Sequence, residues 1–297
     1  MWIIYIIFIF MNVKVSFSYL NKHLLQHVQP FKMRKNLCEQ LNIDYKYLTY
    51  KQAKIIMHNE MNTIDIYGDN TIDKNVEHVF PQYLFKNDNN KNIMKSDLHN
   101  LYLCNSRLNT LRQNFKYISH EDYIDNSNDN LVDQQGNSVK AKDMFQKKGY
   151  IMIINKKNKK FIPTMYSRGM ISRSLAYFSI KYNYLDQLKE VIDIQTLIEW
   201  NLKDPVTNEE YYKNIIAYKH QNNLNPFILD SDLMLYAFSD MININDELLQ
   251  KKKTTTIDPL FSIDYLIDKI NILENDKLIL ERENKKLDKK NKKIKNK

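Results

Sequence analysis

The amino-acid sequence predicts an α+β fold, in which a strand–strand–helix unit lies within a mainly helical domain. Residues 74–80 and 98–103 are apolar segments of strand length, bounded by polar or turn-forming residues. Residues 107–115 follow the second segment with helical spacing. Residues 168–200 and 208–220 then repeat apolar side chains at helical spacing over longer stretches. With 43% hydrophobic residues, a chain of 297 residues can bury a sizeable core.

Residues 1–34 are expected to be a targeting segment. Trp2–Met11 is apolar and uncharged, but too short to span a bilayer comfortably, so no stable membrane span is expected. The run suits the apolar region of a secretory signal, which predicts a secreted or vesicular protein. A buried strand or helix is the alternative. The acid-free stretch 18–36 also fits a two-part address to a plastid-like organelle or a mitochondrion.

The main domain is expected to cover residues 35–235, with further helices and strands around the central unit. Pro81 closes the first strand, and Pro205 interrupts the helical pattern near the end of the domain. The remaining expectations are a helix over 35–59, a turn at 65–70, polar loops at 86–95 and 121–137, a strand at 150–154, and amphipathic helices over 168–184, 185–200 and 208–220.

Residues 236–297 are expected to form a linker and a basic helical tail. Leu266, Leu273, Leu280 and Leu287 fall seven residues apart, which predicts a coiled coil and self-association through residues 263–287. A single frayed helix explains the pattern equally well, because the second seam position becomes polar after two heptads.

The net charge of +9 is concentrated in this tail. Residues 281–297 hold nine basic and three acidic residues, which is a charge of +6 and leaves +3 for the rest of the chain. A basic chain is therefore not in itself a sign of a nucleic-acid groove. Cys38 and Cys104 allow at most one internal disulfide, and the sequence leaves open whether they pair.

The candidate chemistry lies in the strand–strand–helix unit. Glu77 and His78 are adjacent on the first strand, so both can serve one site only at a strand end or bend, which Pro81 makes plausible. Asn109, Arg112 and Asn114 follow the second strand, on the predicted helix. Histidine can deprotonate water near neutral pH, carboxylate and amide oxygens suit a hard divalent cation, and arginine can bind a phosphate.

Five segments in order resemble the endonuclease I family of bacterial ββα-metal (His-Me finger) nucleases. They are EHVFPQ followed by DLHNL and N-x-x-R-x-N, then SRGMISRSLAYFSIKY at 167–182, and WNLKDPVTNEEYYKNIIAYKHQNNLNPFI at 200–228. The resemblance covers about residues 45–230 and departs from the family pattern at Met170, Lys213 and Leu224. It implies a metal finger within the helical domain.

The resemblance also implies a role for each matching position. His78 falls on the general base, Glu77 and Asn114 on the metal ligands, and Arg112 on the helix arginine. The implied cofactor is Mg²⁺ or a similar cation such as Mn²⁺ or Ca²⁺, and the implied product carries a 5′ phosphate. The implied partner is DNA or RNA, bound through its phosphate backbone with little sequence specificity. The matching supporting residues are Asp97, His99 and Asn109.

Two other classes of function stay open. A nucleic-acid-binding or tethering protein with a decayed catalytic site would use the tail as its working part, although Glu77, His78 and Asn114 are all present. A membrane-anchored structural coiled-coil protein would use residues 2–11 and 260–297, but leaves the middle of the chain unexplained.

Overall fold

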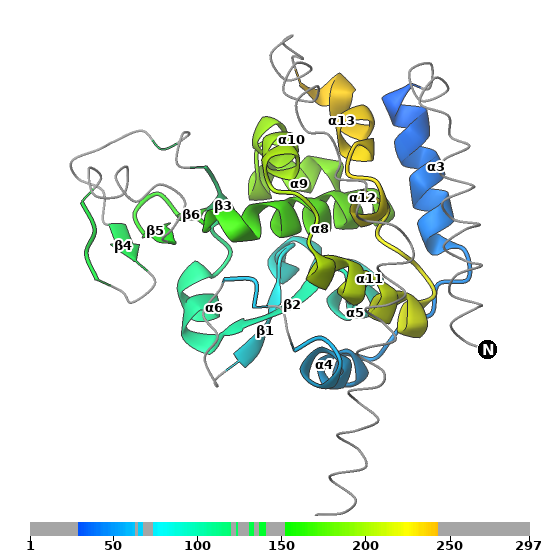
Figure 1. The fold of residues 1–297 in the computed structure, drawn as a ribbon, viewed down its shortest axis with the longest axis horizontal. Helices are drawn as coiled ribbons and strands as arrows, with labels where there is room; N and C mark the ends of the chain where they lie inside the picture. The colour runs from blue at the N-terminus through cyan, green and yellow to red at the C-terminus, as the bar shows by residue number, and fades with distance from the viewer. Residues whose placement is uncertain are drawn as a thin grey trace, which may run out of the picture. The chain divides into compact units, whose positions relative to one another are not determined.

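Helix α8 (Arg168–Lys181) lies at the centre of the described helices (Figure 1). The sequence predicts an amphipathic helix here, but every residue of α8 except Arg168 and Met170 is buried. The reason is that helices pack on several sides of it: α3 (Pro30–Asn42), α9 (Leu185–Val191), α10 (Ile194–Lys203) and α12 (Pro226–Leu229). A helix surrounded in this way is apolar or internally paired all round.

The computed structural model describes residues 29–62, 65–67, 74–119, 123, 131–133, 137–140 and 152–242. The expected targeting segment up to residue 28 and the heptads at 263–287 lie outside these residues. The expected domain boundaries at 34/35 and 235/236 fall inside α3 and α13, respectively. Within these described residues, the other helical elements are α4 (Tyr50–Asn59), α5 (Lys91–Lys95), α6 (Ser106–Arg112), α11 (Asn208–Gln221), α13 (Leu233–Phe238), and three 3₁₀ turns, η1 (Gln82–Phe85), η2 (Met165–Ser167) and η3 (Ser239–Met241).

Two of the expected helices are each divided in two. The helix expected over 35–59 ends at Asn42, because Asp44 adopts a positive φ of 52° and Thr49 starts α4 with a capping box. The helix expected over 185–200 is broken at Ile192, which is extended, so that α9 and α10 are separate. The polar loop expected at 86–95 ends in α5.

Strands β1 (Lys74–His78) and β2 (Leu101–Asn105) form an antiparallel pair, in which Val76 lies opposite Leu103 and His78 opposite Leu101. Helix α6 follows β2 directly. Strand β2 begins three residues later than expected from the sequence, because residues 98–100 form a turn whose Asn100 side chain bonds the backbone of Phe80.

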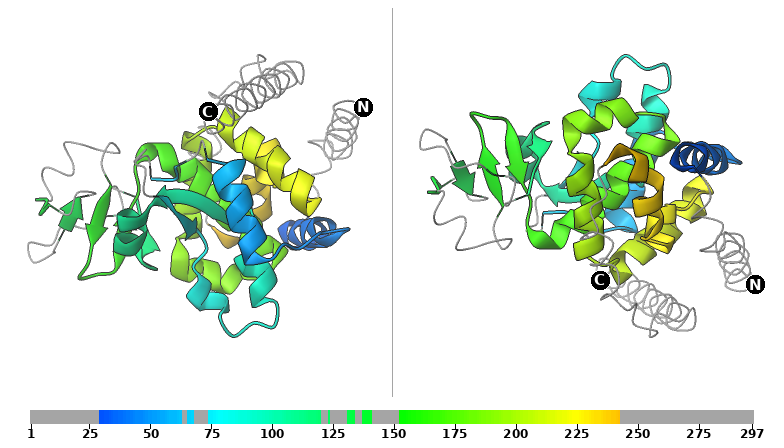
Figure 2. Two further views of the ribbon diagram at one scale, coloured as in Figure 1. Left: turned by 90° about the horizontal axis from the view of Figure 1, so that it is seen from below. Right: turned by 90° about the horizontal axis from the view of Figure 1, so that it is seen from above.

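A second sheet lies at one end of the described fold, in the order β3–β6–β5–β4 (Figure 2). Its strands are β3 (Lys116–Tyr117), β6 (Lys160–Ile162), β5 (Ile153–Asn155) and β4 (Leu131–Asp133), with β3 parallel to β6. Only the strand expected at 150–154 corresponds to one of them. Strand β4 falls within the loop expected at 121–137, so that expectation was wrong for residues 131–133.

One apolar core joins the β1–β2 pair to two helices. It contains buried side chains of α4, β1, β2 and α11, including Met57, Val76, Leu103 and Ala217. The two cysteines are both free thiols, Cys38 in α3 and Cys104 in β2. Among the described residues, no helix has the length and apolarity needed to cross a membrane.

Candidate active site

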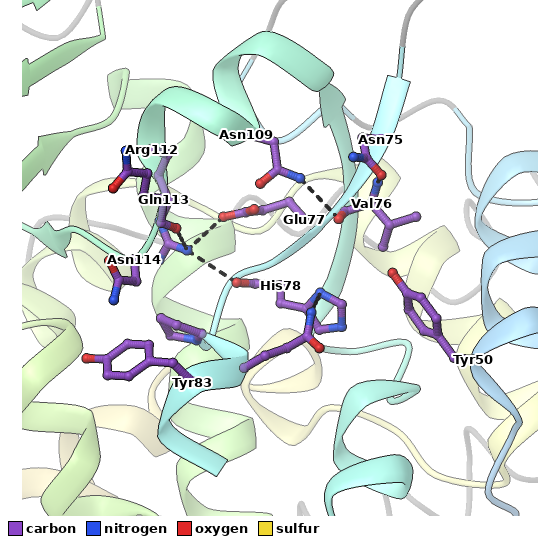
Figure 3. A pocket seen from close by; sticks show the side chains of 12 residues that line it. Tyr50, Asn75, Val76, Glu77, His78, Tyr83, Asn109, Arg112, Gln113 and Asn114 are labelled. Carbon is purple, nitrogen blue, oxygen red and sulfur yellow. Dashed lines mark hydrogen bonds and ion pairs between the residues drawn. The ribbon is translucent and has the colours of Figure 1, made fainter. Parts of the chain in front are cut away.

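A pocket of roughly 500 Å³ opens beside the end of β1 (Figure 3). His78 is the last residue of β1, which is the strand-end position that lets neighbouring side chains serve one site. Five of the seven residues expected from the sequence line this pocket: Glu77, His78, Asn109, Arg112 and Asn114. The other lining residues are Tyr50, Asn75, Val76, Pro81, Gln82, Tyr83 and Gln113.

The Glu77 carboxylate is buried, with 2% of the residue exposed. Its Oε1 atom accepts a hydrogen bond from Tyr67 Oη at 2.8 Å and pairs with Arg112 Nη1 at 2.9 Å. Burial raises the pKa of Glu77, and the neighbouring Arg112 charge and the Tyr67 hydroxyl counteract that rise. One carboxylate oxygen therefore has two donors that hold the side chain in a fixed orientation.

Hydrogen bonds to both ring nitrogens fix the tautomer of His78. Nε2 lies 2.9 Å from the Lys95 carbonyl oxygen, which can only accept, so Nε2 carries the proton. Nδ1 then has the free electron pair and accepts from Gln82 Nε2 at 3.1 Å. Burial lowers the pKa of His78 to about 4, so the imidazole is neutral at pH 7 and keeps the electron pair on Nδ1.

Arg112 joins the end of β1 to the end of α6. Besides Glu77, its guanidinium donates to the carbonyl oxygens of His78 at 3.4 Å, Val79 at 3.1 Å and Gln113 at 3.1 Å. It also lies 4.6 Å above the ring of Tyr117. With 1% of its surface exposed, Arg112 lines the pocket as a buried charge that is already paired.

Asn109 makes a second connection between these elements. Its Nδ2 donates to the Val76 carbonyl oxygen at 3.2 Å, which ties α6 to β1 (Figure 3). Unlike Asn109, Asn114 is exposed and makes no hydrogen bond with the residues that the structure describes.

The sequence places Asn114 on a helix, and this was wrong. Helix α6 ends at Arg112, and Gln113 adopts φ 52° and ψ −122°. The Phe115 N–H donates to the Arg112 carbonyl oxygen at 3.1 Å. These values and this bond describe a type II′ turn, with Gln113 and Asn114 as its central residues. The turn places Asn114 on the same pocket as Glu77.

Asp97 and His99 lie away from the pocket lining, in a buried polar cluster. Asp97 accepts hydrogen bonds from Lys181, Tyr177 and Tyr182 of the α8 segment at 2.8–3.0 Å. Burial raises the pKa of Asp97, but the Lys181 charge, together with His99 and the hydrogen bonds from Lys181 and Tyr182, holds it well below the ordinary value. His99 Nε2 lies 3.2 Å from the Asn223 carbonyl oxygen. The contacts of Asp97 and His99 therefore join the segment before β2 to α8 and to the chain after α11.

Glu77 and Asn114 suit a hard divalent cation. Both carry oxygen donors and both line the pocket, and Mg²⁺ often takes one or two protein ligands and keeps several waters. No group of three or more His, Cys, Asp and Glu side chains that could hold a metal occurs among the described residues. Such a donor set favours Mg²⁺ or Mn²⁺ over a four-ligand zinc site.

Three residues at the site were missed by the sequence reasoning. Tyr67 holds Glu77, Gln82 covers His78 Nδ1, and Gln113 forms the turn before Asn114. Gln82 and Gln113 lie within the segments that resemble the family, so the sequence itself provided a reason to consider them. Tyr67 belongs to no such segment, and no spacing marks it.

Comparisons with known proteins point to one family. The sequence profile of the family described as Endonuclease I matches residues 41–232. The chain is also 27% identical over 237 residues to Endonuclease-1 of Buchnera aphidicola subsp. Baizongia pistaciae (strain Bp), an alignment that covers 70% of this chain and 86% of the relative.

Proposed function

This chain belongs to the endonuclease I family and is an endonuclease, and we propose that it hydrolyses phosphodiester bonds of DNA or RNA with a divalent cation. We propose further that its products carry a 5′ phosphate and that it has little sequence specificity. The observation that supports this most is that Glu77 and His78 of β1 line one pocket with Asn114 from the turn after α6.

His78 acts as the general base in this proposal. Its Nδ1 carries a free electron pair, while the Nε2 proton is held by the Lys95 carbonyl oxygen. The imidazole therefore accepts a proton from water at Nδ1 without a change of tautomer. The Gln82 amide occupies this position in the structure, so it has to move aside before a water molecule can bind there.

Glu77 and Asn114 would hold the cation. A cation bound there would neutralise charge on the phosphate and on the leaving 3′ oxygen. The chain's own contribution is to keep both ligands in place. Tyr67 and Arg112 fix the Glu77 carboxylate, and the turn after α6 directs Asn114 into the pocket.

The remaining residues support this arrangement. Arg112 lines the pocket, so its guanidinium can add positive charge beside a bound phosphate while it holds Glu77. Asn109 fixes α6 on β1. Asp97 and His99 support the β2 segment from behind, through their contacts with α8 and with the chain after α11.

We also propose that the substrate is bound through its phosphates, so that binding weakens as salt rises. The secretory pathway remains our proposal for the compartment, and self-association through residues 263–287 our proposal for the tail.

Cleavage of plasmid DNA, single-stranded DNA and RNA tests the proposed function. We expect cutting with Mg²⁺ or Mn²⁺, none with EDTA, and a loss of about 10²–10⁴-fold in rate for His78→Ala. The control is His58→Ala, which removes an exposed histidine near the end of α4. DNA that is retained but never cut would favour the binding or tethering protein, and a fully active His78→Ala variant would refute His78 as the base.

A further inference from the structure

We propose that Gln113 is a positioning residue, whose strained backbone directs the Asn114 amide into the pocket. This inference rests on the proposed function, because it takes Asn114 to be a metal ligand. Gln113 has φ 52° and ψ −122°. The first central residue of a type II′ turn is usually glycine, because a side chain there meets the neighbouring backbone.

The conformation persists because the contacts around the turn determine it. The Gln113 N–H donates to the Asn109 carbonyl oxygen at 3.1 Å, and its own carbonyl oxygen accepts from Arg112 Nη1 at 3.1 Å. The Phe115 N–H donates to the Arg112 carbonyl oxygen, and the Phe115 side chain is buried. A strained residue fixed on both sides in this way is typical of functional sites.

The strain has a geometric effect on Asn114. If residue 113 were helical, α6 would continue past Arg112. Side chains two positions apart on a helix point about 200° apart, because each residue turns the helix by about 100°. Arg112 faces the pocket, so Asn114 on a continued helix would face away from Glu77. The turn at Gln113 reverses the chain instead, and Asn114 lines the pocket.

The chain contains a matched control for this position. Asp44, Asn183 and Asn222 also have positive φ, but aspartate and asparagine tolerate that conformation. Lys159, with φ 53°, is the remaining non-glycine residue of this kind in the described part of the chain. It is exposed in the turn between β5 and β6 and does not line the pocket.

The test combines Mn²⁺ titration calorimetry with thermal melting of the full chain. We expect Gln113→Gly to raise the melting temperature by about 2–4 °C with unchanged Mn²⁺ affinity, because glycine adopts this turn without strain. Gln113→Val should weaken Mn²⁺ binding about tenfold, because a β-branched side chain is least tolerated there. Lys159→Val should lower the melting temperature but leave Mn²⁺ affinity unchanged.

The outcomes separate this inference from the proposed function. If Mn²⁺ binds equally well to the natural chain and to Asn114→Ala, the proposed metal site is refuted, and this inference with it. If binding depends on Asn114 but Gln113→Val binds as tightly as the natural chain, only the positioning role of Gln113 is refuted. A lower melting temperature for Gln113→Gly would refute the strain itself, and the same loss of affinity in Lys159→Val would show a general effect of destabilisation.

Discussion

At the residue scale, the site depends on a buried pair of charges. Glu77 Oε1 and Arg112 Nη1 lie 2.9 Å apart, and 3% of the Glu77 side chain and 1% of the Arg112 side chain are exposed. Removing one partner of such a pair typically costs about 3–5 kcal/mol, because the other charge stays buried. The pair therefore fixes the orientation of Glu77, and substitutions of Arg112 will affect folding as well as activity.

Gln82 gives a residue-scale prediction. Its amide must leave His78 Nδ1 before water can bind, and a hydrogen bond of this kind is worth about 0.5–1.5 kcal/mol. Gln82→Ala should therefore raise the initial cleavage rate about two- to tenfold at saturating Mg²⁺. Gln40→Ala, which removes an exposed glutamine of α3, should leave the rate unchanged. A tenfold lower rate for Gln82→Ala would mean that Gln82 holds the water or the substrate instead.

The sequence predicted which residues lie together at the pocket but not their conformations. The order of the motif segments placed Glu77, His78, Arg112 and Asn114 in one unit, and the structure brings them to one pocket. The turn at Gln113 could not be predicted, because glutamine is not a turn-forming residue. The Arg112 side chain that bonds its carbonyl oxygen is held in place by Glu77 and His78, which lie far away in sequence.

At the element scale, Lys213 of α11 fixes the turn before β2. It is buried, donates to the Leu98 carbonyl oxygen and lies 4.0 Å from the ring of Tyr102. Burial lowers its pKa to about 7, although the charges of Asp97 and Glu210 counteract this. The unfolded chain therefore binds more protons than the folded chain between pH 7 and the ordinary lysine pKa near 10.4.

This difference makes stability depend on pH. Because the unfolded state binds more protons in that range, the free energy of unfolding should rise with pH, by up to about 1.4 kcal/mol per pH unit from Lys213 alone. Lys213→Met should have a higher free energy of unfolding than the natural chain at pH 7. Its free energy of unfolding should also increase less with pH, because the contribution of Lys213 is absent. Urea denaturation of the two proteins at pH 7 and pH 9 measures their free energies of unfolding and how these change with pH. Equal pH slopes for the two proteins would contradict the prediction.

Helices were easier to predict than sheets for physical reasons. Apolar spacing located α8 and α11 because both continue over 14 residues. Strands β3 and β4 have two and three residues, too short for an alternating pattern to be recognised. The break between α3 and α4 depends on a left-handed Asp44, which carries only a weak turn signal.

At the scale of the whole molecule, α3 is part of the folded domain, although the family profile matches only residues 41–232. It packs against α8 and α13, and its Met33, Leu37 and Leu41 side chains are buried. Arg34 pairs with Asp240 at 2.6 Å and donates to the Ala237 carbonyl oxygen. The domain is thus closed by contacts between segments about 200 residues apart in sequence.

Two truncated chains test this closure. Residues 29–242 should melt cooperatively and cleave DNA, whereas residues 44–242 should not fold stably. Burial of each Met or Leu side chain contributes about 1.5–3 kcal/mol, so losing the three in α3 removes an amount comparable to the whole stability of a typical domain. Circular dichroism melting and the cleavage assay distinguish the two chains. A cooperative melt of residues 44–242 would show that α3 is dispensable.

The position of α3 also limits how the chain could mature. A protease that removed a leader at the sequence-based boundary after residue 34 would cut inside this helix and separate Arg34 from Asp240. A cut before Pro30 leaves the helix and its contacts intact. We therefore expect the N-terminus of any processed form, as read by mass spectrometry of the protein from its source, to lie at or before Pro30.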